Sequence, residues 1–125
     1  MNVLLTMGSV LTLGLLFTPV ARAEAPTKVQ TEVNFLLGFV EGSGCAFYRN
    51  GSWYDSKAAQ AHLREKYNYL AAGNQIGSGE DFIEKAATKS SFSGQPYQVK
   101  CNGGAALTSN KWLRDELARF RTFQP

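Results

Sequence analysis

The sequence has few residues that bind metal ions or act as nucleophiles. Histidine occurs once, as His62, and cysteine twice, as Cys45 and Cys101. These residues and the scattered carboxylates do not form a ligand set at a recognised spacing, so we predict no metal site. The chain also contains no phosphate-binding loop, no dinucleotide fingerprint and no Gly-x-Ser-x-Gly motif. We therefore expect no cofactor, and no catalytic constellation is recognisable.

Charge of one sign is also scarce. The chain has 13 Lys and Arg against 10 Asp and Glu, a formal net charge of +3, and no block of like charge. Proteins that bind nucleic acid or anionic membranes carry a clustered positive surplus. The small surplus here predicts neither kind of partner.

One long apolar run is present, at the N-terminus. It covers residues 3–17, and the small residues Ala21 and Ala23 follow at the positions that a signal peptidase requires. The run is slightly short for a spanning helix, which needs about 20 apolar residues. We predict a signal peptide over residues 1–23 and a mature chain over residues 24–125. That chain would be periplasmic or secreted and would have no membrane span after cleavage.

The mature part is long enough for one domain, and it contains both cysteines. An exported protein meets an oxidising compartment, in which paired thiols normally form a disulfide. A Cys45–Cys101 bond would enclose 55 residues, and closing a loop of that size stabilises a domain by roughly 4 kcal/mol. The alternative is a free, nucleophilic Cys45 that works with His62.

Hydrophobic periodicity predicts helices in four places. Apolar residues recur at three-and-four spacing in segments 28–41, about 57–72, a short segment after Ser78, and 109–121. Asp55 or Ser56 can cap the second of these helices, and Ser78 has capping-box spacing to Asp81.

Turn chemistry predicts three strands. Asn50-Gly51 between two aromatic-rich runs is typical of a β-hairpin, with strands at 45–49 and 52–54. Alternation predicts a third strand over 96–101, which Asn102-Gly103 ends. The expected fold is α+β, a small three-stranded antiparallel sheet (the hairpin plus one later strand) with about four helices on one side. The disulfide would join the first strand to the third if these are neighbours.

Several strings resemble a known family. The run Phe82-Ile83-Glu84-Lys85 leading into residues 90–97, the segment 39–45 and the stretch 47–66 are similar to the YfeK-like family of small, uncharacterised bacterial exported proteins. The resemblance spans nearly all of the mature chain. It implies export to the periplasm and carries no assigned activity, so it supports the compartment and leaves the function open.

His62 is the one candidate for catalysis. It could serve as a general base at the rim of a cleft. It could equally be a half-buried residue that donates one hydrogen bond to a loop carbonyl. Lys66 lies four residues later on the same helical face, and a positive neighbour favours the neutral imidazole.

Two surface features suggest ligand binding. Alternation places Trp53 and Tyr54 on opposite faces of the hairpin, so one of them should meet solvent. The turn at residues 90–94 could present hydroxyls and backbone N–H groups to an anion or a sugar, or could simply end a helix. The candidate contact residues are Trp53, Tyr54, Ser90, Ser91, Ser93 and Tyr97.

The sequence thus favours an exported protein that binds an envelope protein or a small ligand without catalysis. The hairpin and the loop of residues 90–97 would form its binding face. A second hypothesis is a small periplasmic hydrolase that uses His62 with Cys45 or a serine. A third is an inhibitor of an envelope hydrolase.

Overall fold

The computed structural model describes residues 25–124, so the predicted signal peptide over residues 1–23 lies outside the described residues. Helices and strands follow in the order α1 (Thr27–Gly42), β1 (Ala46–Arg49), β2 (Ser52–Tyr54), α2 (Ser56–Ala72), α3 (Gly79–Ala86), β3 (Gln98–Lys100), β4 (Leu107–Thr108) and α4 (Ser109–Thr122). The α+β class, the four helices and the antiparallel sheet are confirmed.

The sheet has four strands in the order β2-β1-β3-β4, so the prediction of three was wrong. The missed strand, β4, is two residues long and pairs with β3 through Val99 and Leu107. Asn102 and Gly103 before it both have positive φ, 52° and 72°. This is the same combination that forms the β1–β2 hairpin at Asn50-Gly51. Asn102-Gly103 is therefore a turn within the connection of residues 101–106 that joins β3 to β4, and not only the end of a strand.

The central strands β1 and β3 are neighbours, and their pairing brings the cysteines together. Ala46 lies opposite Lys100 in the register, which places Cys45 and Cys101 just beyond the last pair. The two form a disulfide with a Cα–Cα distance of 4.4 Å. The predicted covalent bond is confirmed and fastens the start of β1 to the end of β3.

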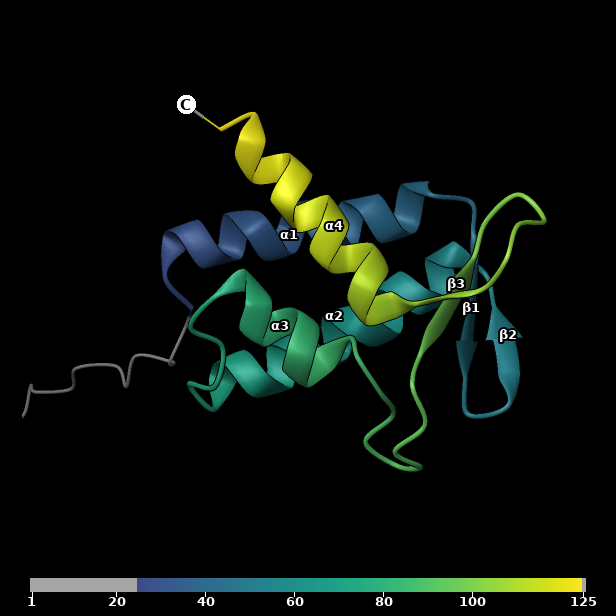
Figure 1. Ribbon diagram of the computed structural model, residues 1–125. Helices are drawn as coiled ribbons and strands as arrows, with labels where there is room; N and C mark the ends of the chain where they lie inside the picture. The colour runs from purple at the N-terminus through teal and green to yellow at the C-terminus, as the bar shows by residue number, and fades with distance from the viewer. Residues whose placement is uncertain (1–24, 125) are drawn as a thin grey trace, which may run out of the picture.

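The helices lie to one side of the sheet, and the core fills the space between these layers (Figure 1). The apolar stripe predicted for α1 is buried: Val29, Val33, Leu36, Leu37 and Val40. Side-chain caps fix where two helices begin, since Asp55 accepts from the backbone N–H of Ala58 and Ser78 from that of Asp81. None of the helices within residues 25–124 is long and apolar enough to cross a membrane.

The two faces of the sheet differ as alternation predicts. The paired Phe47 and Val99 are buried against the helices. The next pair across the hairpin, Tyr48 and Trp53, is on the opposite face, where Trp53 is 46% exposed. Tyr54 is on the helix side and half-buried. The face with Trp53 is the one that meets solvent.

Candidate ligand-binding site

The hairpin turn and the loop of residues 90–97, predicted as one binding face, meet in space. The Ser93 hydroxyl donates a 2.5 Å hydrogen bond to Asn50 Oδ1, 43 residues away in the chain. Beside this contact is an open groove of about 510 Å³, hereafter the outer groove. The residues that line it are Tyr48, Asn50, Gly51, Phe92, Ser93 and Gln95. Phe92 projects from the loop and is 91% exposed.

The predicted serines have three different surroundings. Ser90 is buried, and its hydroxyl accepts from the backbone N–H groups of Phe92 and Ser93 at 3.1 and 3.2 Å. It holds the turn in shape, as Ser does in local hydroxyl turns. Ser93 lines the outer groove, whereas Ser91 lines a separate hollow beside Lys66 and Tyr69. Only Ser93 therefore faces the groove.

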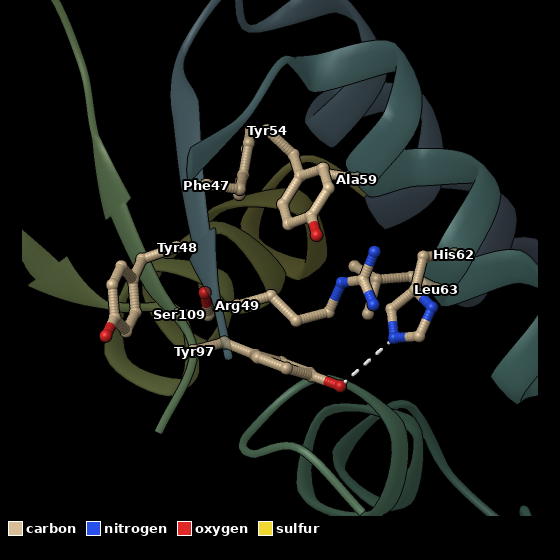
Figure 2. A pocket seen from close by; sticks show the side chains of 9 residues that line it. All are labelled: Phe47, Tyr48, Arg49, Tyr54, Ala59, His62, Leu63, Tyr97 and Ser109. Atoms are coloured by element: carbon tan, nitrogen blue, oxygen red, sulfur yellow. Dashed lines mark hydrogen bonds between the residues drawn. The ribbon is translucent and has the colours of Figure 1, made fainter. Parts of the chain in front are cut away.

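A second hollow, the inner cavity, lies between the sheet and α2. Its volume is about 30 Å³, room for roughly one water molecule. It is lined by Phe47, Tyr48, Arg49, Tyr54, Ala59, His62, Leu63, Tyr97 and Ser109 (Figure 2). Tyr48 lines both hollows. Both hollows therefore border β1 at Tyr48, whose side chain points away from Arg49 and His62 (Figure 2).

The Tyr97 hydroxyl is the polar centre of the inner cavity. His62 Nε2 and Lys66 Nζ each lie 3.1 Å from it. Lys66 Nζ also donates to the backbone carbonyl of Lys89 at 3.1 Å. His62 is half-buried as predicted, but its partner is a phenol and not a loop carbonyl.

Arg49 completes the cluster from the adjacent strand. Its guanidinium lies 4.4 Å from the centre of the Tyr54 ring, a cation–π contact. Figure 2 shows the side chain extending between Tyr54 and Tyr97 toward His62. Sequence analysis did not single out Arg49. The signal was its register, because Arg49 shares the inward face of β1 with buried Phe47, where a charged residue is unexpected.

Burial and positive charge shape the protonation of the cluster. Burial, with the charges of Arg49 and Lys66, holds the pKa of His62 below its usual range. Burial and Arg49 likewise lower the pKa of Lys66. Burial raises the pKa of Tyr97, against the opposite influence of Arg49. The expectation of a neutral imidazole beside Lys66 agrees with the lowered pKa.

Neither a thiol nor a metal site is part of this cluster. Cys45 is bonded to Cys101, which excludes it as a free nucleophile. Within residues 25–124, no group of three His, Cys, Asp or Glu side chains is placed to hold a metal ion. The chemistry available at the site is hydrogen bonding, aromatic stacking, positive charge and proton exchange at the His62 imidazole.

Comparison with known proteins places the chain among relatives that have no assigned activity. A family model described as "Family of unknown function (DUF5329)" matches residues 27–121. The "Uncharacterized protein YfeK" of Salmonella typhimurium is 33% identical over 84 residues, which cover 66% of this chain and 68% of that protein. No solved structure matches the chain.

Proposed function

This chain belongs to the DUF5329 family of unknown function, whose model covers residues 27–121, and we propose that it is an exported envelope protein that binds a ligand without transforming it. The outer groove carries this proposal. It is formed by the hairpin and by the loop of residues 90–97, and the two are held together by Ser93 and Asn50. Binding sites are commonly hollows positioned by a rigid scaffold.

The groove has the chemistry of a saccharide site. Tyr48 and Phe92 supply aromatic rings, Asn50 and Gln95 supply amides, and none of the described residues that line it is charged. A sugar presents an apolar C–H face and a rim of hydroxyls. The rings can stack on that face, while the amides can both donate to and accept from the hydroxyls. We infer that the ligand is a saccharide of the cell envelope.

The direct test is a titration with soluble oligosaccharides released from the cell envelope. Binding should change the fluorescence of Trp53, which lies 5.4 Å from the Tyr48 ring, and should raise the melting temperature. Phe92→Ala should weaken binding about tenfold, because it removes an aromatic face without creating a core cavity.

Phe123→Ala is the matched control for that substitution. Phe123 is also a highly exposed phenylalanine, at 73%, and it follows α4, outside the residues that line the groove. Its replacement should leave the affinity unchanged. Equal affinity of the Phe92 and Phe123 variants, or no binding to the unmodified protein, would count against the proposal.

Export is tested by the intact mass of the protein recovered from the cell envelope. The apolar run and the small residues at positions 21 and 23 support cleavage after residue 23. We expect a chain that begins at Glu24 and that takes up an alkylating reagent only after reduction. A chain that retains residues 1–23 would contradict this part of the proposal.

A hydrolase that uses His62 is the second candidate, favoured by the position of this imidazole in the inner cavity. The version with a Cys45 thiol is wrong because of the disulfide. A serine version predicts that His62→Gln abolishes breakdown of envelope substrates while saccharide binding persists. If the unmodified protein releases no product from such substrates, the hydrolase hypothesis fails and the binding protein remains.

A further inference from the structure

The inner cavity brings positive charge together without a carboxylate partner. Arg49 and His62 line it, and Lys66 lies just behind the Tyr97 hydroxyl. Neither Arg49 nor Lys66 forms an ion pair within residues 25–124. In the same part of the chain, three other arginines each pair with a glutamate. Buried cations are normally paired with an anion, and these partly buried cations leave a positive charge that a bound anion would balance.

The donors in the cluster are arranged for an oxyanion. Stacking on the Tyr54 ring fixes the Arg49 guanidinium by its face and leaves the N–H edge available, and that edge matches carboxylate and phosphate oxygens. His62 lies on the other side of the cavity with its Nε2 bonded to the Tyr97 hydroxyl, so it acts through its charge when protonated (Figure 2). Lys66 is committed to Tyr97 and Lys89 and acts through its charge.

The size of the cavity limits what enters it. A volume of about 30 Å³ admits an end group but not a whole ligand. The outer groove, about 510 Å³, is a separate hollow bordered by Tyr48, whose side chain lies on the opposite face of the sheet. The cavity would therefore take the end group of an anion independently of the groove.

We propose that the inner cavity binds an oxyanion, a carboxylate or a phosphate group, with Arg49 as the direct contact and with His62 and Lys66 acting through their charge. This inference goes beyond the proposed function, because the cavity is a different hollow from the groove. Positive charge in a low-dielectric hollow strengthens binding of an anion relative to the same charges on an open surface.

Proton uptake should accompany binding. Arg49 from β1, Lys66 and Glu65 from α2, and Tyr97 ahead of β3 are the charged and titratable groups that act on His62. Only Glu65 favours the imidazolium, and it is the weakest of the charges that act on it. A bound anion would add a second favourable charge and raise the pKa of His62. Affinity should therefore increase as the pH falls toward the titration range of His62.

The test uses sulfate and acetate as probes, followed through the imidazole NMR signals of the one histidine in the chain. Both keep a constant charge around neutral pH. Saturable shifts, with His62 titrating at a higher pH in the presence of the probe, are expected. Tighter binding of acetate identifies a carboxylate, and tighter binding of sulfate identifies a phosphate-type group.

Arg49→Gln should weaken binding of the probe about tenfold or more, since it removes a charge-assisted contact. Arg64→Gln, the same replacement on an exposed residue of α2, should not. Lys66→Gln should weaken binding of the probe about threefold, because a nearby positive charge is lost. Lys57→Gln is its control. This second pair still tests the proposal if the Arg49 variant does not fold. Equal effects within these pairs, or no probe-dependent shift, would overturn the proposal.

The same titrations separate this inference from the proposed function. Probe binding that depends on Arg49, together with saccharide binding that does not depend on Phe92, would sustain the anion site and refute the groove. Saccharide binding that depends on Phe92, without any probe binding that depends on Arg49, would sustain the groove and refute the anion site.

Discussion

Arg121, near the end of α4, faces two carboxylates, whereas Arg49, at the hairpin end of the molecule, faces a histidine and a tyrosine. Arg121 donates two hydrogen bonds to Glu32, at 2.7 and 2.9 Å, and two to Glu80, at 2.6 and 2.9 Å. We call this group the Arg121 clamp, because it joins α4 to α1 and α3. The clamp is complete within the chain, while the Arg49 cluster is not. The difference separates charges that stabilise the fold from charges available to a ligand.

The hairpin end depends on a covalent bond where the other end depends on the clamp. Replacing both Cys45 and Cys101 by Ala should lower the free energy of unfolding by about 4 kcal/mol, because the unfolded chain loses a cross-link across 56 positions. Urea denaturation of the oxidised protein and of the double variant measures this loss. A reducing agent should not change the variant further. A loss below about 1 kcal/mol would show that the sheet holds the hairpin end without the disulfide.

Breaking the clamp should have the next largest effect. Arg121→Gln leaves Glu32, only 4% exposed, without its charge partner. Removing one member of a fully buried pair costs about 3 to 5 kcal/mol, and we expect about 2 to 3 kcal/mol because Arg121 is 39% exposed. Thermal and urea unfolding measure the change.

Lys111→Gln is the control for this change, because it removes a cation from the exposed i,i+4 pair with Asp115. Its cost should stay below about 0.5 kcal/mol. If the two variants lose the same stability, the clamp is no more important than an ordinary surface ion pair.

The clamp also shows which contacts a sequence cannot reveal. Glu32 and Arg121 are separated by 89 positions, and no local rule connects them. The elements that sequence analysis did locate depend on neighbours in the chain: the Asn50-Gly51 turn, the Asp55 and Ser78 caps, and the apolar stripe of α1. These signals act within a few residues, and the structure follows them.

In the candidate site, too, local features could be predicted from the sequence and long-range contacts could not. Turn chemistry drew attention to the turn at residues 90–94, and alternation predicted that one of Trp53 and Tyr54 meets solvent; the structure puts Ser93 on the groove and leaves Trp53 exposed. Arg49 was missed because its neighbours come from α2 and from Tyr97, which only the tertiary fold brings to it. Strand β4 was missed although Asn102-Gly103 repeats the hairpin signal, because two residues are too few to show alternation.

A glycine beside the clamp gives a smaller test of how tightly that end is packed. A Cβ on Gly79 would lie 2.8 Å from Glu32 Oε1 and 3.1 Å from Leu117 Cδ2. The Glu32 carboxylate cannot move away easily, because Arg121 holds both of its oxygens. Gly79→Ala should therefore cost about 1 kcal/mol net of the gain in helix propensity.

Gly38→Ala provides the matched substitution for Gly79. Nothing lies within 4 Å of a Cβ at position 38, which is in the middle of α1. The change should stabilise the protein by about 0.5 to 1 kcal/mol. Loss of stability at both positions would mean that crowding at the clamp is not the reason for the effect at Gly79.

Acid should weaken the Arg121 clamp and the region around His62 in different pH ranges. Hydrogen bonds from Arg121 hold the pKa of Glu80 at about 2, against an ordinary 4.5, and also lower the pKa of Glu32. The folded state therefore binds these protons less readily than the unfolded state. This contribution is present above pH 4.5 and is lost as the pH falls toward 2.

His62 affects stability in a higher pH range, and there too a fall in pH lowers the stability. Its pKa is lowered from an ordinary 6.5, first by burial, so below pH 6.5 the unfolded chain takes up a proton that the folded chain resists. Stability should fall as the pH falls from 6.5. Urea midpoints against pH should lose this upper phase in His62→Gln and part of the lower phase in Glu80→Gln. An upper phase that survives in His62→Gln would contradict the assignment.

Arg49→Gln repeats the change made at Arg121 and should have the smallest effect on stability. The variant loses the cation–π contact with Tyr54, worth about 0.5 to 1 kcal/mol. It also removes the charge that lowers the pKa of both His62 and Lys66. These terms oppose each other, so unfolding should change by less than about 0.5 kcal/mol while the pKa of His62 rises. A loss as large as that of Arg121→Gln would mean that Arg49 stabilises the fold, and the contrast between a completed and an open charge cluster would no longer hold.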